Sequence, residues 1–450
     1  MPPITLTIIV GAGPSGLLLA LLLARAGIRV LVLEQNHSLD PSPRATHFAP
    51  PAVYELRRAG VADRLRKEGF TPRTVCWRKP DGAYIAGLDG SVHDGDRERM
   101  ICLSLQRVGE VLYEELVGAC GGRTAVVRYG CRVVAVGQDK GREAWVDVEV
   151  AGETGKTRER IAGDYVVGCD GANSQVRRAL FGERNFPGRT WDEQIVATNT
   201  YYDFDRFGWE DSNFIVHPED YYMAARISKD GMWRVTYGEA SGLSRDELLA
   251  RQPGKFEKML PGNPKPHQYK VVSISPYRIH QRMAEKMRVG RILLAADAAH
   301  LVNPFGGMGL MGGIVDVGGL YDCLVGIHEG KADETILDKY NDVRQQKWRD
   351  FSDPISCENL RRLWKDPETI GDEDEFLLAL KRTAVDPEFS DEFQKVGGVL
   401  SAAVGGADQV FCREFTPFSM ISPSTTRMKG LWRTCREQMQ RWMWARQRTT

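Results

Sequence analysis

The chain has 450 residues, of which 42% are hydrophobic and 27% charged, values typical of globular proteins that exclude disordered, collagen-like and coiled-coil classes. Sixty Lys and Arg residues balance sixty Asp and Glu residues, so no overall positive charge exists to hold nucleic acid. The nine Cys are an odd number without a CxxC pair, which favours a reducing compartment and argues against a structural zinc site.

The N-terminus lacks the pattern of a targeting segment. It has no basic region, and the apolar residues Ile8–Val10 lead into a glycine-rich turn instead of a cleavage site. The longest apolar run, Leu17–Ala24, is far shorter than the ~20 residues that a membrane-spanning helix needs. We therefore expect a cytoplasmic protein without an integral membrane segment.

The first forty residues predict a βαβ unit. Thr5–Val10 and Ile28–Leu33 fit buried strands, and Leu17–Ala26 fits a helix rich in Leu and Ala that Gly27 closes. Such a unit is the usual start of a dinucleotide-binding domain when a glycine-rich turn follows its first strand.

That turn carries the spacing Gly11-x-Gly13-x-x-Gly16, and Glu34 ends the second strand. The first glycine permits a tight turn, the second lets the backbone approach a pyrophosphate, and the third allows close packing of helix and strand. The helix N-terminus attracts phosphates, and Glu34 can accept hydrogen bonds from ribose hydroxyls. The pattern predicts bound FAD or NAD rather than a 2′-phosphorylated cofactor.

Two further carboxylates follow predicted buried strands. Asp170 comes after the strand that starts at Asp164, and Asp297 comes after Arg291–Ala296. An acid in this place can simply cap the next helix, which is the competing explanation. Because the carboxyl ends of parallel strands form the ligand-binding edge of such sheets, we expect Glu34, Asp170 and Asp297 to surround one cofactor.

A second glycine pattern, Gly307-x-Gly309-x-x-Gly312, follows Asn303-Pro304-Phe305 and not a strand. A second nucleotide-binding fold is therefore disfavoured. We interpret the segment as a loop whose amides, with the helix N-terminus that follows, face an electron-rich group.

These blocks resemble the group A flavoprotein monooxygenases, which have the para-hydroxybenzoate hydroxylase fold. The resemblance covers about residues 1–365 and rests on three blocks in order, Gly11–Glu34, Asp164–Arg177 and Gly290–Asp316. It implies that FAD is bound by Gly11, Gly13, Gly16, Glu34, Arg44, Ala45, Gln106, Arg107, Asp170, Asp297, Pro304, Gly309 and Leu310. Two departures are Ala296, where the family usually has Gly, and Met311, where it often has Asn.

The order of elements predicts an α/β fold in which a Rossmann-like FAD-binding domain is interleaved with a mixed β-sheet substrate domain. The first is expected at residues 1–71, 101–180 and 280–365, and the second at 72–100 and 181–279. Residues 366–450 are predicted to form a C-terminal helical region. Its basic, Trp-containing helix at Arg427–Arg448 could dock on the core or on a membrane surface.

The resemblance also implies a reaction. NADH or NADPH reduces FAD, O2 forms a hydroperoxide at flavin C4a, and one oxygen atom is transferred to an electron-rich aromatic ring. Amides near Gly309 and Leu310 would stabilise the reduced flavin. We predict an NAD(P)H-consuming hydroxylase of a small phenolic or polyketide-type aromatic, with a homodimer as a possible assembly. Oxidative dearomatisation, Baeyer–Villiger-type insertion, halogenation and a non-enzymatic regulatory role remain alternatives.

Four residues are candidates for catalysis at the substrate site: His47, Tyr222, Arg226 and Tyr237. A base or cation that favours the phenolate form would assist hydroxylation, and His47 lies three residues after Arg44. Period-2 alternation places Tyr222 and Arg226 on one face of a strand, with Tyr237 on the next strand of a hairpin. Ordinary sheet packing is the commoner explanation for such tyrosines.

Overall fold

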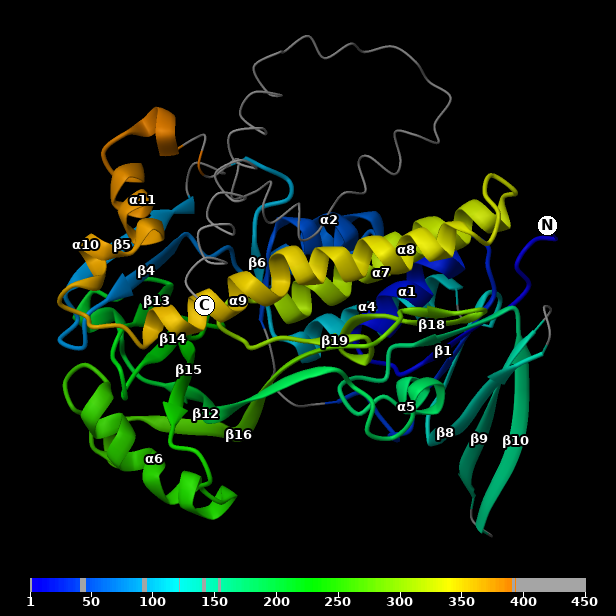
Figure 1. The fold of residues 1–450 in the computed structure, drawn as a ribbon, viewed down its shortest axis with the longest axis horizontal. Coiled ribbons are helices and arrows are strands. Elements are labelled where there is room, and N and C mark those ends of the chain that lie inside the picture. The colour runs from blue at the N-terminus through cyan, green and yellow to red at the C-terminus, as the bar shows by residue number, and fades with distance from the viewer. Residues whose placement is uncertain are drawn as a thin grey trace, which may run out of the picture. The chain divides into compact units, whose positions relative to one another are not determined.

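The computed structural model describes residues 2–40, 46–90, 95–120, 122–139, 143–152, 155–390 and 393. Two sheets organise this part of the chain, one of six strands and one of eight (Figure 1).

The six-stranded sheet has the order β17-β18-β11-β1-β2-β7, and its neighbours are parallel except for β17 and β18. Its strands are β1 (Thr7–Val10), β2 (Val30–Leu33), β7 (Ala125–Arg128), β11 (Tyr165–Gly168), β17 (Arg288–Val289) and β18 (Ile292–Leu294). Strands β1 and β11 are buried along their whole length because helices cover both faces of the sheet. The predicted βαβ unit is confirmed.

Helix α1 (Pro14–Arg25) joins β1 to β2 and begins three residues before the predicted start, at Pro14. Proline suits the first helical position because the N–H that it lacks has no partner there. Helices α4 (Leu105–Cys120) and α7 (Met308–His328) pack against α1. Helix α7 is long and apolar enough to cross a membrane, but 72% of its apolar window is buried, which is typical of a core helix.

The eight-stranded sheet has the order β19-β16-β12-β15-β14-β13-β4-β5. Its strands are β4 (Thr74–Arg78), β5 (Tyr84–Asp89), β12 (Gly188–Tyr201), β13 (Ser212–Ile215), β14 (Tyr222–Arg226), β15 (Met232–Glu239), β16 (Lys270–Met283) and β19 (His300–Leu301). Strands β14 and β15 form the predicted hairpin. Most of this sheet comes from the predicted substrate domain, although the boundary predicted at residues 279 and 280 falls inside β16.

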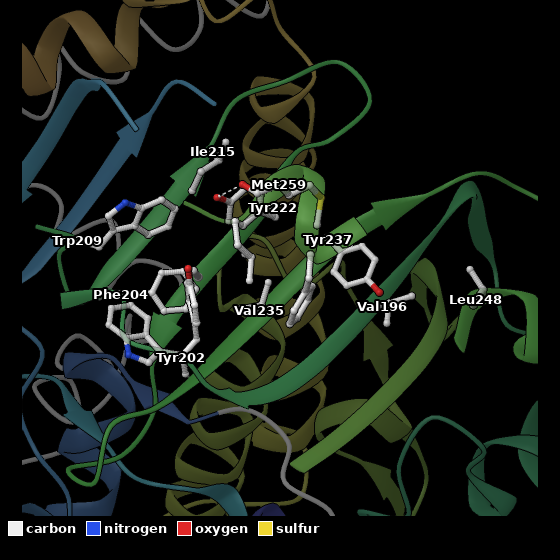
Figure 2. Packing of buried hydrophobic residues seen from close by; sticks show 14 residues of the cluster. Val196, Tyr202, Phe204, Trp209, Ile215, Tyr222, Val235, Tyr237, Leu248 and Met259 are labelled. Carbon is white, nitrogen blue, oxygen red and sulfur yellow. Dashed lines mark hydrogen bonds between the residues drawn. The ribbon is translucent and has the colours of Figure 1, made fainter. Parts of the chain in front are cut away.

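The two faces of this sheet have different partners. Helix α6 (Arg245–Met259) covers one face, where aromatic side chains of the sheet pack around its residues Leu248 and Phe256 (Figure 2). On the opposite face, Ile195 and Ile279 pack with Phe305, which lies shortly before α7. That opposite face therefore meets the segment that leads into α7.

The remaining elements complete the layers around both sheets. They are β3 (His47–Phe48) paired with β6 (Ile101–Cys102), the sheet of β8 (Cys131–Gln138), β9 (Ala144–Gly152) and β10 (Gly155–Gly163), and the helices α2 (Pro50–Arg58), α3 (Ala62–Glu68), α5 (Gln175–Phe181), α8 (Ile336–Lys347), α9 (Asp353–Leu363), α10 (Ile370–Glu373) and α11 (Glu375–Thr383). The predicted C-terminal region contributes α10 and α11, and its basic helix lies outside the described residues.

Candidate active site

The three predicted carboxylates follow neighbouring strands of the six-stranded sheet. Glu34 comes after β2, Asp170 after β11 and Asp297 after β18, and the glycine turn after β1 lies between the first two of these strands. Because these strands are parallel, all four segments lie along the carboxyl edge of one sheet.

The glycine turn uses its three glycines in different ways. Gly11 has φ +103°, and a Cβ added there would lie 2.5 Å from the carbonyl oxygen of Cys169. A Cβ at Gly16 would collide with the carbonyl oxygen of Gly11. A Cβ at Gly13 would meet no heavy atom within 4 Å. Gly11 and Gly16 are therefore required by the protein's own packing, whereas Gly13 has open space where a ligand can approach the backbone.

Glu34 and Asp170 both accept hydrogen bonds from backbone N–H groups. Glu34 accepts from Ala12 at 2.8 Å, which holds the glycine turn against the end of β2. Asp170 Oδ2 accepts from Gln175 and Val176 at 2.7 and 3.2 Å at the start of α5, so the helix-capping explanation holds for that oxygen. The other oxygen, Asp170 Oδ1, is buried without a hydrogen-bond partner, and burial raises the pKa of this carboxyl group.

The segment before α7 presents backbone amides. The carbonyl of Pro304 accepts hydrogen bonds from the N–H groups of Gly306 and Gly307 at 2.9 and 3.2 Å, which forms a turn. Gly307 has φ +66°, and α7 then begins without a side-chain cap or an acidic residue in its first turn. The first-turn N–H groups of Gly309 and Leu310 therefore lie at the positive end of a long helix.

A buried ion-pair network supports this segment. The carboxylate of Asp316, on α7, lies 2.6 Å from His300 Nε2 and 2.7 Å from Arg344 Nε. Burial alone would raise the pKa of Asp316, but its interactions with His300 and Arg344 lower that pKa to about 2. Asp316 also accepts the backbone N–H of Ala296 at 2.9 Å, next to Asp297. The network links α7 to the loop after β18.

Helix α4 carries two predicted FAD contacts, Gln106 and Arg107, and the structure places them differently. Gln106 donates to Glu110 at 3.0 Å and lies one turn before Gly109, whose added Cβ would be 3.9 Å from Pro14 in α1. Arg107 instead pairs with Glu68, Glu110 and Glu114 at 2.6 to 3.0 Å, so its guanidinium already has acidic partners within the protein. Arg44 and Ala45 lie outside the described residues.

The carboxyl edge fits a dinucleotide cofactor. The open space at Gly13 gives a ligand room to approach the backbone. Asp170 Oδ1 is a buried acceptor without a hydrogen-bond partner, and the uncapped start of α7 is the positive end of a helix. Sequence patterns identified this edge because strand ends are readable from hydrophobicity and glycine spacing.

The predicted substrate residue His47 lies on β3, which pairs with β6, and it interacts electrostatically with Arg234 of the eight-stranded sheet. Its Nδ1 is 2.9 Å from Thr46 Oγ1, and its Nε2 is buried without a hydrogen-bond partner. Burial, together with the charge of Arg234, lowers the pKa of His47 to about 4, although Asp211 opposes the shift. The imidazole is thus neutral near pH 7.

The two predicted tyrosines belong to the core and not to this site. Figure 2 shows Tyr222 and Tyr237 within the cluster that includes Leu248 of α6. Phe305 belongs to a separate cluster with Ile195 and Ile279. Tyr222 donates to the carbonyl of Met259 at 2.8 Å, and both side chains are at most 1% exposed. Sheet packing accounts for both, so we do not retain a catalytic role for them.

Arg226 also has structural partners. It forms ion pairs with Asp205 and Asp211, and its guanidinium lies over the ring of Trp233, 5.0 Å from the centroid. It shares the Tyr222 face, as alternation predicts, so the structure does not favour its predicted catalytic role either.

The opposite face carries polar residues that sequence reasoning missed. Arg234 of β15 pairs in register with Asn199 of β12 and donates to its side-chain oxygen at 3.1 Å from Nε. Tyr277 of β16 pairs with Ile195, so it shares the face that meets Phe305. The alternation in β15 could have indicated this face, because the polar residue Arg234 lies between the apolar residues Trp233 and Val235.

The fold and the carboxyl edge are those of a dinucleotide-binding protein, and the comparisons with known proteins define its class. Residues 5–353 match the family model described as FAD binding domain. The chain is 37% identical over 395 residues to para-nitrophenol 4-monooxygenase of Pseudomonas sp. strain WBC-3, covering 87% of this chain and 96% of the relative. It is 38% identical over 362 residues to 6-hydroxy-3-succinoylpyridine 3-monooxygenase HspB of Pseudomonas putida, covering 79% and 88%.

Solved structures agree with these sequence relatives. The crystal structure of p-nitrophenol 4-monooxygenase PnpA from Pseudomonas putida superposes with a TM-score of 0.77 at 34% identity, covering 87% of this chain and 99% of that one. The flavin-dependent monooxygenase PieE shares the fold, with a TM-score of 0.69 at 21% identity. The chain belongs to the group A FAD-dependent aromatic monooxygenases, as the sequence blocks predicted.

Proposed function

We propose that the protein hydroxylates a small ring that carries a hydroxyl group, either a para-substituted phenol or a hydroxypyridine. The two relatives described above are named for a nitrophenol and a hydroxylated pyridine. The match to the first relative covers 87% of this chain and 96% of that relative. This substrate class is narrower than the phenolic or polyketide-type aromatics that the sequence predicts.

The observation that carries the proposal is the state of His47. Its imidazole is neutral at neutral pH, its Nε2 is buried without a partner, and the cation Arg234 lies within electrostatic reach. In the tautomer whose Nδ1–H donates to Thr46 Oγ1, the neutral Nε2 can accept a hydrogen bond from a substrate hydroxyl group. That hydrogen bond draws the hydroxyl proton away from the ring and makes the ring more electron-rich, which favours attack on an electrophilic oxygen.

FAD, when bound, supplies the redox chemistry and activates O2 at the expense of NAD(P)H. The chain supplies the binding groups. Gly13 leaves the backbone open to the pyrophosphate, Asp170 and Asp297 lie where the strands end, and the amides of Gly309 and Leu310 offer donors to the electron-rich part of the ring system. The side chains at Ile195 and Phe305 exclude water from the adjoining face.

The test is a panel of phenols, hydroxypyridines and ring compounds without hydroxyl groups, added to purified protein with NADH or NADPH. We expect hydroxylated rings alone to accelerate cofactor oxidation and to appear as hydroxylated products. Acceleration that requires halide, or equal acceleration by rings without hydroxyl groups, would contradict the proposal. Two further parts of the proposal are a cytoplasmic location and a homodimer. Fractionation of cells that make the protein tests the first, and light scattering of the purified protein tests the second.

A further inference from the structure

Gln281 of strand β16 joins the segment before α7 to helix α9, and its side chain is 1% exposed. Its Oε1 accepts hydrogen bonds from the backbone N–H of Asn303 and, at 3.4 Å, from Asn303 Nδ2. Its Nε2 donates to Asp353 Oδ1 at 2.7 Å and to Ser356 Oγ at 3.1 Å, both in α9. One buried amide therefore connects the substrate sheet, the segment before α7 and α9.

The neighbours of this amide fix its orientation. A backbone N–H can only donate and a carboxylate accepts, so Oε1 of Gln281 faces Asn303 and its Nε2 faces Asp353. An aliphatic side chain here would leave the buried N–H of Asn303 without this acceptor, which is the costly case for a buried polar group. A glutamate would keep that acceptor but would place a second carboxylate beside Asp353. An amide is therefore the side chain that suits both partners.

Asn303 extends this hydrogen-bonded network toward the start of α7. Its Oδ1 accepts from the backbone N–H of Phe305 at 3.0 Å, and both residues are at most 1% exposed. The carbonyl of Pro304 then accepts from the N–H of Gly307, the residue directly before α7. A continuous series of hydrogen bonds therefore runs from Gln281 to the residue at which α7 begins.

Apolar packing is the competing explanation for the position of this segment. The ring of Phe305 packs with Ile195, and a Cβ added at Gly306 would lie 3.2 Å from Asn359 Nδ2 of α9, so the segment is closely enclosed. Packing of a ring is not directional, whereas the hydrogen bonds to Asn303 orient the peptide groups themselves. The orientation of the backbone is therefore the property that the amide of residue 281 controls.

We infer that Gln281 is a positioning residue for the cofactor: by holding the segment before α7, it orients the amides of Gly309 and Leu310. This inference rests on the proposed function, in which those two amides are donors to the ring system of FAD. FAD gains negative charge on reduction, so correctly oriented donors at a positive helix end favour its reduced form over its oxidised form. Gln281 acts through the backbone and raises the reduction potential of the bound cofactor.

The test compares the reduction potential of bound FAD in the wild type and in Gln281→Met, which has a side chain of similar length without the amide. The variant should favour reduced over oxidised FAD about 10-fold less than the wild type, because one hydrogen-bonded constraint is lost. For a two-electron couple this is a potential about 30 mV more negative. Equilibration with reference dyes gives the potential, and titration of the apoprotein gives the affinity for oxidised FAD.

A second pair of variants tests the hydrogen-bond pattern itself. Gln281→Glu alone should lower the potential, because two carboxylates then face each other. The double variant Gln281→Glu with Asp353→Asn exchanges the two groups and keeps the net charge of the wild type, so its potential should return toward the wild-type value. Equal potentials in the single and double variants would overturn the inference, also where Gln281→Met does not fold.

Gln194→Met is the matched control. Gln194 is a buried glutamine of the neighbouring strand β12, 7% exposed, and it donates to the carbonyls of Ala240 and Leu243 at 3.2 Å. Its loss should leave the potential unchanged. A shift as large as that of Gln281→Met would overturn the inference, since the loss of any buried amide would then suffice.

The remaining outcomes separate the inference from the proposed function. If Gln281→Met binds oxidised and reduced FAD more weakly by the same factor, the potential is unchanged and the residue supports the fold only. That result would overturn the inference and leave the proposed function standing, provided that the wild type still hydroxylates phenols. Wild-type protein that binds no FAD would overturn both.

Discussion

Asp316 accepts a hydrogen bond from the backbone N–H of Ala296 at 2.9 Å, and this contact ties helix α7 to the loop that carries Asp297. Ala296 has φ +58°, a left-handed conformation that costs a residue with a Cβ roughly 1 kcal/mol. The family usually has glycine here, and a Cβ added at Gly313 would lie only 2.7 Å from the Ala296 methyl carbon. The carboxylate of Asp316 therefore holds a strained turn beside the cofactor edge.

Asp316→Asn should lower the free energy of unfolding by about 3 kcal/mol, because it removes a buried carboxylate charge that lies 2.7 Å from the Arg344 guanidinium. FAD should also be released more readily. Thermal unfolding and flavin absorbance after gel filtration measure the two effects. Asp338→Asn is the control: Asp338 pairs with Arg288 but is 67% exposed, so its loss should change little. Equal melting temperatures for both variants would contradict the assignment.

The same carboxylate predicts an acid dependence of stability. The pKa of Asp316 is lowered from 3.8 to about 2, so its stabilisation is present above pH 4 and is lost as the pH falls toward 2. The shift corresponds to about 2 kcal/mol. Urea unfolding at pH 5 and pH 3 should show a larger loss for the wild type than for Asp316→Asn. Parallel losses would show that Asp316 does not titrate in this way.

The glycine turn offers a test that separates folding from cofactor binding. Gly13→Ala should fold as stably as the wild type but bind FAD at least about tenfold more weakly, because its methyl group enters the open space beside the backbone. Gly16→Ala should lose both stability and FAD, because its methyl group collides with the Gly11 carbonyl. Apoprotein melting curves and FAD titrations distinguish these results. A Gly13→Ala protein with normal FAD affinity would place the pyrophosphate elsewhere.

His47→Asn should reduce the rate of substrate hydroxylation about 10- to 100-fold while FAD occupancy stays normal, because the hydrogen-bond acceptor for the substrate hydroxyl group is lost. Since the pKa of His47 is about 4, the wild-type rate should show no acid limb near pH 6.5, the ordinary pKa of histidine. Product formation at several pH values provides the measurement. An acid limb near pH 6.5 that disappears in the variant would mean that His47 is solvated.

The two tyrosines of the α6 core should affect stability and not turnover. Tyr222→Phe removes the hydrogen bond to Met259 and should cost about 1 kcal/mol of unfolding free energy. Tyr237→Phe should cost nothing or stabilise the protein, because its buried hydroxyl has no hydrogen-bond partner. Denaturant unfolding and steady-state rates of both variants provide the comparison. A large fall in rate with unchanged stability would return these tyrosines to the active site.

Site residues that directly follow a strand could be predicted from the sequence. Glu34, Asp170 and Asp297 each follow a buried strand, and parallel order alone brings such positions to one edge. The glycine turn follows for the same reason, because Gly11 and Gly16 are required by contacts between neighbouring elements. The cofactor side of the site is therefore a local property of the chain.

The substrate side depends on distant packing. Alternation assigns Tyr222 and Tyr237 to faces of their strands, but it does not reveal which face of the sheet α6 covers. The covered face is the one that packs against Leu248 and Phe256, and these residues lie in the separate segment that forms α6. Arg107 could not be assigned either, since two of its partners come from its own helix and the third, Glu68, from α3.

The most direct test of the central claim is hydroxylation of 4-nitrophenol under isotopically heavy O2, with FAD-loaded protein and NAD(P)H. The account predicts that mass spectrometry finds one heavy oxygen atom in each molecule of hydroxylated product, and that Gly13→Ala protein without FAD forms none. Product whose new oxygen comes from water, or product formed equally without FAD, would contradict it.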